Sequence, residues 1–309
     1  MRFEPPSGRQ VEIHRGAQRA VVVEVGGGLR EYEVSGQPVL DGYAINRIAD
    51  GARGQPLLPW PNRLADACYT FGEQRLQLPI DEVERNNAIH GLTRWRNWSV
   101  AEQAPDRVRM EHMLHPQPGY PFALQLSNEY VLNDLGLTVR TSAHNLGGQR
   151  LPFGTGQHPY LTVGTPLVDS ATLRLACHAR LDLDPERRLP TARMLPVEGS
   201  EYDFRQPRPI GPLVLDECYT QLDLEADGRA RVTLADPATA RSLTVWMDAR
   251  YRYVQVFSGE TLAAERRRRS LAIEPMTCPP DAFRSQIDVI VLEPDESIML
   301  AWGISPSAL

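Results

Sequence analysis

The spacing of glycine and proline is the feature that most constrains the fold of this chain. The 309 residues include 23 glycines and 26 prolines, which fall at intervals of roughly ten residues, as turn residues do in all-β proteins. Between them lie short segments in which apolar and polar residues alternate, the period-2 pattern of a half-buried strand. This pattern is clear in five segments, residues 124–127, 137–140, 173–177, 231–234 and 243–247.

Residues 20–34 are predicted to form a hairpin. An apolar strand ends at Val25, the triplet Gly26-Gly27-Gly28 makes the turn, and a second strand runs to Val34. A nucleotide-binding glycine loop is excluded because it needs a following helix, whereas residues 29–34 alternate like a strand. No amphipathic run of twelve or more residues has helical spacing. The pattern therefore predicts an all-β protein, a large antiparallel β-sandwich, rather than an α/β fold.

We expect residues 1–309 to form a single domain. The sequence has no internal repeat and no low-complexity tract. The proline-rich stretch 196–212 resembles a linker, but it contains Tyr202 and Phe204, which a flexible tether rarely carries, so we interpret it as an ordered surface connection.

Charge and cysteine content limit the class of partner. The net charge of −6 provides no field that would attract nucleic acid or an anionic membrane. No apolar run approaches the length of a membrane span, and the first residues lack the apolar stretch of a secretory signal. The four cysteines have no paired metal spacing, so we expect buried thiols in a reducing compartment and a cytoplasmic protein. We expect a monomer or a homodimer.

Two other motifs give no support for metal or serine chemistry. His112, His115 and His144 lack the His-x3-His or thiolate spacing that zinc sites use, so we expect no metal ligand among them. Ser258-Gly259 lacks the first glycine of a nucleophile elbow. We expect neither a metal nor a cofactor.

Two histidines and one glutamate have a different setting. His90 lies among asparagine and glycine and is followed by Trp95, while His158 lies in a glycine-flanked aromatic turn with Tyr160. Aromatic rings with a few fixed polar groups suit a sugar, whose C–H face stacks on rings and whose hydroxyls need hydrogen bonds. Glu274 lies among apolar residues on a predicted strand, where a carboxylate needs a partner or a chemical role.

The run Arg266–Arg269 has two interpretations. It can be a solvated connection between a strand that ends near Ser258 and the strand at Leu271. Alternatively, one or two of its guanidinium groups can hold an anionic substituent of a ligand.

Five short segments resemble the motifs of the aldose 1-epimerase family. They match its Asn-Arg motif, its Asn-x-x-His-Gly motif, its second histidine segment, its Asp-x-x-Phe/Tyr segment and its glutamate strand. They occur in the family's order, at residues 59–64, 87–91, 156–160, 215–219 and 272–275. The resemblance extends from about residue 20 to about residue 305 and implies a galactose mutarotase-like supersandwich with an open cleft for a monosaccharide.

The resemblance also implies a role for each site residue. Glu274 takes the proton from the anomeric O1 hydroxyl, and His158 gives one to the ring oxygen O5. The substrate-binding residues that it implies are Arg63, His90, Asp216, Asn62, Trp95 and Tyr160. The chain departs from the family at Pro159, Met276 and residues 59–61, which affects the choice of sugar rather than the acid and the base.

The reaction implied is mutarotation, the exchange of the α and β anomers of a free aldohexose such as glucose or galactose. It needs one acid and one base, which we expect to titrate near neutrality with the glutamate ionised. Three alternatives stay open: a mutarotase for an anionic sugar (sulfoquinovose or a hexose 6-phosphate), a carbohydrate-binding sandwich without catalysis, and a glycoside hydrolase, which needs two carboxylates astride the bond.

Overall fold

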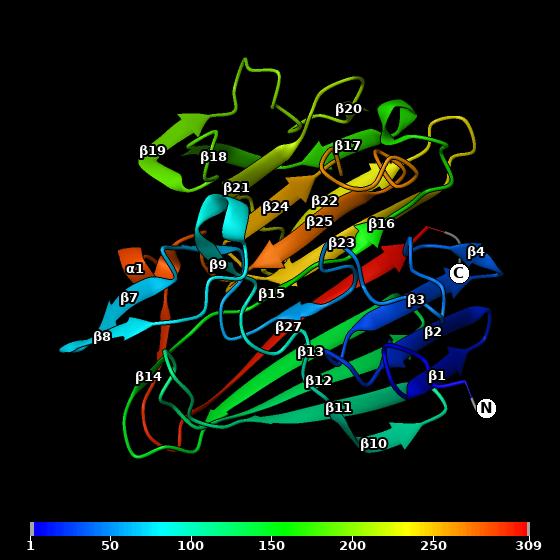
Figure 1. Cartoon of the computed structure of the whole chain (residues 1–309). Coiled ribbons are helices and arrows are strands. Elements are labelled where there is room, and N and C mark those ends of the chain that lie inside the picture. The colour runs from blue at the N-terminus through cyan, green and yellow to red at the C-terminus, as the bar shows by residue number, and fades with distance from the viewer. Residues whose placement is uncertain (1–2, 308–309) are drawn as a thin grey trace.

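The computed structural model describes residues 3–307, and two large antiparallel sheets form most of the molecule (Figure 1). The larger sheet has nine strands. In spatial order they are β10 (Ser99–Ala104), β11 (Arg107–Leu114), β12 (Leu124–Asn133), β13 (Gly136–Asn145), β27 (Ser297–Pro306), β23 (Ser242–Asp248), β22 (Arg229–Ala235), β17 (Thr172–Leu175) and β20 (Arg208–Pro209).

The second large sheet has eight strands and carries the candidate site. Its order is β19 (Pro190–Pro196), β18 (Cys177–Leu183), β21 (Asp216–Leu222), β24 (Tyr253–Phe257), β25 (Leu271–Met276), β15 (Gly156–Gln157) and β5 (Pro56–Leu57), with β16 (Tyr160–Leu161) also paired to β25.

Smaller sheets and short helices surround these two layers. The sheets are β1 (Gln10–Arg15), β2 (Gln18–Val23), β3 (Leu29–Val34) and β4 (Gln37–Pro38), then β14 (Leu151–Phe153) with β26 (Ile290–Leu292), β6 (Arg63–Ala65) with β9 (Asn87–Ile89), and β7 (Cys68–Phe71) with β8 (Gln74–Gln77). The helices are α1 (Ala282–Ser285) and the 3-10 turns η1 (Val83–Arg85) and η2 (Val168–Ser170). Among residues 3–307, no helix has both the length and the apolar character needed to traverse a bilayer.

The strands predicted from alternation are confirmed, with one correction. The segments 124–127, 137–140, 231–234 and 243–247 lie inside β12, β13, β22 and β23. The segment 173–177 is not one strand, because β17 ends at Leu175 and β18 begins at Cys177, and these strands belong to different sheets. The chain crosses between the two layers at this point, which alternation alone does not reveal.

The predicted hairpin at 20–34 is also confirmed. β2 and β3 pair antiparallel, with Val21 opposite Glu31. Gly26 and Gly27 have φ of 80° and 60°, a left-handed conformation that favours glycine. A Cβ on Gly27 would lie 2.7 Å from the ring of Trp98, so the turn depends on glycine for space as well as for conformation.

The apolar faces of the large sheets enclose one continuous core, which contains residues from Val11 to Ile304. Stretch 196–212 is anchored to it, because Phe204 is buried and its carbonyl accepts a hydrogen bond from the amide of Leu175. The four cysteines are free thiols, and all except Cys68 are buried.

Strand alternation separates this core from the polar face of the eight-stranded sheet. Val254, Val256 and Ile273 of β24 and β25 belong to the core. Gln255 and Glu274, which lie directly opposite each other in the register, therefore point to the other face. The candidate site is built on that face.

We predict that Gly91→Ala destabilises the protein far more than Gly16→Ala. Both glycines have positive φ, 76° and 56°, which costs an alanine about 1–2 kcal/mol. A Cβ at Gly91 would also lie 2.0 Å from the carbonyl oxygen of Leu58, whereas nothing lies within 4 Å of one at Gly16. Urea unfolding of both variants tests the prediction, and equal losses would show that the segment at Leu58 can move aside.

Candidate active site

Six of the eight predicted site residues line one pocket on the polar face of the eight-stranded sheet. They come from β6 and the residue before it, the segment after β9, the turn after β15, β21 and β25, which are distant in the sequence. These residues are Asn62, Arg63, His90, His158, Asp216 and Glu274, and the same pocket is lined by Arg85, Gln255, Phe257 and Thr261.

Glu274 and His158 are in contact at the base of this pocket. The Nε2 atom of His158 lies 3.3 Å from Oε1 of Glu274, and the two side chains are 6% and 2% exposed. Burial raises the pKa of Glu274 well above its usual value, and the charge of Asp216 adds to the effect. Burial also lowers the pKa of His158 to about 3, with a further contribution from Arg53. Both shifts favour the neutral forms of the two side chains, which is opposite in direction to the ionised glutamate expected from the sequence.

Three polar atoms of the pocket have no hydrogen-bond partner among residues 3–307. They are Nδ1 of His158, Oε2 of Glu274 and Oε1 of Gln255, and each is shielded from solvent. Buried polar atoms are rarely left unpaired in native proteins. A ligand that presents several hydroxyl groups within a few ångströms would supply partners for them.

His90 and Asn62 hold each other through reciprocal hydrogen bonds. The amide of Asn62 donates to Nδ1 of His90 over 3.2 Å, and the amide of His90 donates to the carbonyl oxygen of Asn62 over 2.9 Å. Because Nδ1 accepts, the neutral ring carries its proton on Nε2. Burial lowers the pKa of His90 well below its usual value, so His90 acts as a neutral hydrogen-bond donor. Both residues have positive φ, the kind of strain that concentrates at functional sites.

Arg63 is fixed at the edge of the pocket by a buried carboxylate. Its Nε lies 3.0 and 2.9 Å from the two carboxylate oxygens of Glu82, and its Nη2 lies 2.9 Å from one of them. Glu82 also accepts hydrogen bonds from Asn87 and Arg85. This grip on one edge of the guanidinium fixes its plane, which is the geometry that directional recognition of an oxygen ligand requires.

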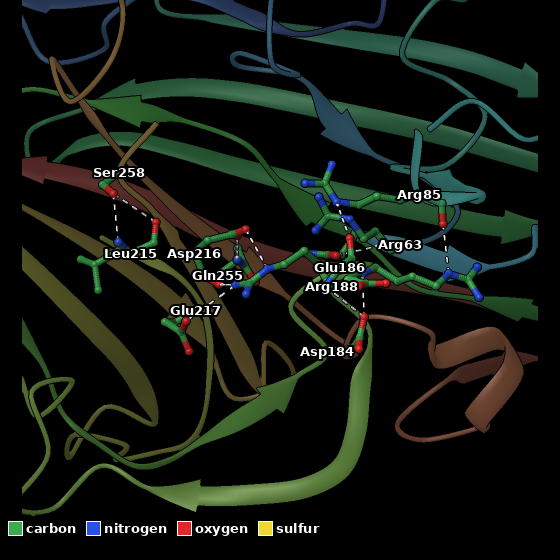
Figure 2. A network of polar contacts seen from close by, with 12 residues as sticks. Arg63, Arg85, Asp184, Glu186, Arg188, Leu215, Asp216, Glu217, Gln255 and Ser258 are labelled. Atoms are coloured by element: carbon green, nitrogen blue, oxygen red, sulfur yellow. Dashed lines mark hydrogen bonds and ion pairs between the residues drawn. The ribbon is translucent and has the colours of Figure 1, made fainter. Parts of the chain in front are cut away.

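Asp216 is held from two sides. Nε2 of Gln255 donates to its Oδ1 over 2.7 Å, and Nε of Arg188 lies 3.0 Å from its Oδ2. Figure 2 shows Arg188 between Asp216 and Glu217, with Arg63 and Arg85 in the adjoining part of the network. The sequence interpretation missed Gln255, Arg188 and Arg85. Only Gln255 had a visible signal, a polar residue between two valines on a core strand.

Two predicted site residues do not line the pocket. Tyr160 is 1% exposed, and its ring stacks on the ring of His158, with 5.0 Å between centroids and 17° between planes. It therefore packs behind the histidine and does not line the pocket. Trp95 is 52% exposed and lies in a separate groove with Trp60 and Arg94, because the chain turns away from the pocket after Gly91.

The arginine run 266–269 lies outside the pocket as well. Arg266 pairs with Asp41 at 2.8 Å, and Arg268 pairs with Asp169 at 2.8 Å and with Glu260. Arg267 is exposed. The run therefore connects β24 and β25 and is tied down by acidic neighbours, which agrees with the first of its two interpretations.

Comparison with solved structures identifies the fold. The fold matches the GalM/aldose epimerase homologue from C. elegans with a TM-score of 0.85, at 17% identity, over 96% of this chain and 98% of the other. A putative aldose 1-epimerase from Escherichia coli K12 matches with a TM-score of 0.83, at 21% identity, over 97% and 99% of the two chains. The fold is the galactose mutarotase-like β-sandwich.

Sequence comparison defines the family. The model of the family described as aldose 1-epimerase matches residues 9–303. The uncharacterized protein YihR of Escherichia coli (strain K12) is 35% identical over 96% of this chain and 93% of its own length. The chain belongs to the aldose 1-epimerase family and is an isomerase that acts on a sugar.

We predict that Glu274→Gln stabilises the fold at neutral pH. A raised pKa means that the folded state binds the proton more tightly than the unfolded chain. Wild-type stability therefore falls as the pH rises from 4.5 to the folded-state pKa, by at most about 1.4 kcal/mol per pH unit. Glutamine does not titrate, so the variant's advantage should grow over this range and vanish below it. Urea unfolding at several pH values measures the effect.

The matched control is Glu84→Gln, which removes an exposed carboxylate. Its free energy of unfolding should change with pH as that of the wild type does. A Glu274→Gln variant that is less stable than the wild type at pH 8 would contradict the claim that the carboxylate is held at a desolvation cost.

Proposed function

We propose that this protein is a mutarotase that interconverts the α and β anomers of a free aldohexose of the glucose or galactose type. The observation that carries the proposal is the direct contact of Glu274 with His158 in a pocket that also contains unpaired polar atoms. Galactose mutarotase of Mus musculus, 27% identical over half of this chain and 46% of its own length, supports the choice of substrate class.

The mechanism moves two protons, one from the sugar to Glu274 and one from His158 to the sugar. Glu274 takes the proton of the O1 hydroxyl while His158 gives one to the ring oxygen O5, which opens the hemiacetal to an aldehyde. Rotation about C1–C2 presents the other aldehyde face, and the reverse transfers close the ring as the other anomer. O1 and O5 are bonded to the same carbon, so an acid and a base only 3.3 Å apart suit them.

Burial supplies the driving force for these transfers. The reactive form of the pair is the ion pair, and the product form after ring opening is neutral. A dry pocket disfavours both charges, so it makes the carboxylate a stronger base and the imidazolium a stronger acid than either is in water. The binding of the sugar must then favour the ion pair, which hydrogen bonds from hydroxyls to Glu274 can do.

The remaining lining residues bind and orient the sugar in this proposal. The N–H of His90 and the guanidinium of Arg63 donate to ring and hydroxyl oxygens, Asn62 fixes His90, and Asp216 accepts from hydroxyls. Positioning of this kind lowers the barrier because the reacting groups need no further search.

A second candidate keeps the chemistry and changes the ligand to an anionic sugar, such as sulfoquinovose or a hexose 6-phosphate. The arginine run no longer supports it. The observation in its favour is Arg85, whose side chain is 27% exposed and lines the pocket beside Arg63.

We also propose a single-domain cytoplasmic enzyme. The continuous core from Val11 to Ile304 supports one folding unit, and the four free thiols suit a reducing compartment.

The test uses fresh single anomers of glucose, galactose and sulfoquinovose, and glucose 6-phosphate, with anomer exchange followed by NMR. Catalysed exchange of a neutral hexose supports the proposal, and exchange of an anionic sugar alone favours the second candidate. Binding without exchange of any sugar would leave a carbohydrate-binding sandwich and refute the enzyme mechanism.

We predict that Glu274→Gln lowers the mutarotation rate at least ~10²-fold, because a positioned general base contributes about 10²–10⁴-fold. Circular dichroism should show a native fold, and Glu84→Gln should keep the wild-type rate. Full activity of Glu274→Gln would assign the base to another group.

We predict that Arg63→Ala and Asp216→Ala act mainly on binding, each raising KM about tenfold or more while lowering kcat less, because each loses a charge-assisted hydrogen bond. Glu82 keeps Arg85 and Asn87 as partners in the Arg63 variant, so it should still fold. Steady-state kinetics on the preferred sugar measure KM and kcat separately. A loss confined to kcat would place these residues in the chemical step.

A further inference from the structure

A stack of three side chains leads away from the pocket behind His158. The ring of Tyr160 lies against the ring of His158 at 5.0 Å and 17°, and the guanidinium carbon of Arg53 lies 4.0 Å from the centroid of the Tyr160 ring. The side chain of Arg53 is fully buried. A buried arginine this close to a general acid has a strong influence on it, through packing and through charge.

Arg53 is held rigidly by acidic neighbours. Its Nη1 donates to Oδ2 of Asp41 over 3.0 Å and to the carbonyl oxygen of Asp41 over 2.8 Å, and its Nε donates to Asp50 over 3.1 Å. The amide of Asp41 in turn donates to the carbonyl oxygen of Tyr160 over 2.8 Å. A backbone hydrogen bond therefore holds the stack together in addition to its side-chain contacts.

The arginine run reaches this stack through Asp41. Nη1 of Arg266 donates to Oδ1 of Asp41 over 2.8 Å, and the hydroxyl of Ser270 donates to Oδ2 over 2.7 Å. Asp41 thus links the run to Arg53. Arg266 is therefore connected to the pocket through protein contacts alone, by way of Asp41 and Arg53.

The backbone around His158 is held by hydrogen bonds to residues 51–55, the segment that contains Arg53. The amide of Gly54 donates to the carbonyl oxygen of His158 over 2.9 Å, and the amide of His158 donates to the carbonyl oxygen of Gln55 over 3.1 Å. The hydroxyl of Tyr160 donates to the carbonyl oxygen of Gly51 over 3.1 Å. Residues 50–55 therefore determine both where the imidazole lies and which face it presents.

We propose that Arg53 is a positioning residue for His158, acting through the ring of Tyr160, and that Arg266 supports it through Asp41. The stack keeps Nε2 of His158 on Glu274, and the fixed positive charge opposes the addition of a second proton to the pair. This inference rests on the proposed role of His158 as the general acid.

The charge effect has a definite sign. The charged and titratable groups around the pair are Asp216 on β21, Tyr160 on β16, His90 after β9, and the arginines Arg53, Arg63 and Arg94, with Asp41 and Asp50 bound to Arg53. Removing the positive charge of Arg53 favours protonated states of the pair. Both apparent pKa values of the pair therefore rise, whichever residue holds the proton.

The experiment compares Arg53→Met with Arg53→Lys and Arg267→Ala. In Arg53→Met, Asp41 keeps Arg266 and Ser270, so no buried carboxylate loses all its partners. We expect both limbs of the pH–rate profile to move up by about half to one pH unit. Arg53→Lys keeps the charge and loses the planar stack, so it should lower kcat with the limbs in place. Arg267 is an exposed neighbour of Arg266, and Arg267→Ala should change neither kcat nor the limbs of the pH–rate profile.

NMR of the His158 ring supplies a readout that does not need activity. The ring signals are assigned by their loss in His158→Gln. Their chemical shifts, followed against pH, should report the loss of the proton that the pair shares. The midpoint pH of this change should rise in Arg53→Met. An unmoved midpoint in folded Arg53→Met, or an equal shift in Arg267→Ala, would overturn the inference. A wild type that exchanges no sugar refutes the proposed function alone, because the midpoint still tests the stack.

Tyr160 provides an independent variant pair should Arg53→Met not fold. Tyr160→Phe keeps the ring between Arg53 and His158 and loses only the hydrogen bond to Gly51, so it should lower kcat much less than Tyr160→Leu does. Tyr160→Leu removes the ring and should lower kcat about tenfold or more, because a small displacement of the acid is costly. Equal rates for the two variants would rule out a role for the stack.

Discussion

The mutual burial of Glu274 and His158 is the constraint on which the rest of the site depends. Neither group is stable as an isolated ion in a dry pocket, so each needs the other and a fixed surrounding structure. The surroundings meet this need in layers. Asn62 fixes His90, Glu82 fixes Arg63, Gln255 and Arg188 fix Asp216, and residues 50–55 fix the histidine turn. Few of these supporting residues would contact a sugar, yet they determine where the contacting groups lie.

The eight-stranded sheet makes this arrangement possible because it brings remote segments to adjacent register positions. Gln255 lies opposite Glu274, and Cys218 lies opposite Gln255, so three strands contribute to one row. Strand β6, which carries Arg63, and the loops that carry His90 and His158 complete the pocket around this row. Glu274 and Gln255, which orients Asp216, lie on strands, and a strand positions side chains more precisely than a loop does.

The sequence predicts the strands well because alternation is a local signal. Short motifs identify six residues that line the pocket, whereas Trp95 and Tyr160, which the motifs also assign to the site, do not line it. Both are aromatic and close in sequence to a site histidine, and proximity in sequence does not reveal which side of the histidine a ring occupies. Arg188 and Arg85 carry no local signal at all. Their roles depend on loops that meet only in three dimensions, as does the path from Arg266 to His158.

The division of β24 and β25 into an inner and an outer face has a consequence for how such a protein can change. Along β24 and β25, alternate residues such as Val254, Val256 and Ile273 pack in the core and hold the layers together. The residues between them, such as Gln255, Phe257 and Glu274, line the pocket. Substitutions at Gln255 or Phe257 can therefore alter selectivity while Val254 and Val256 preserve the scaffold. A lineage, or a directed-evolution library, could explore new sugars on this sheet without first sacrificing its ability to fold.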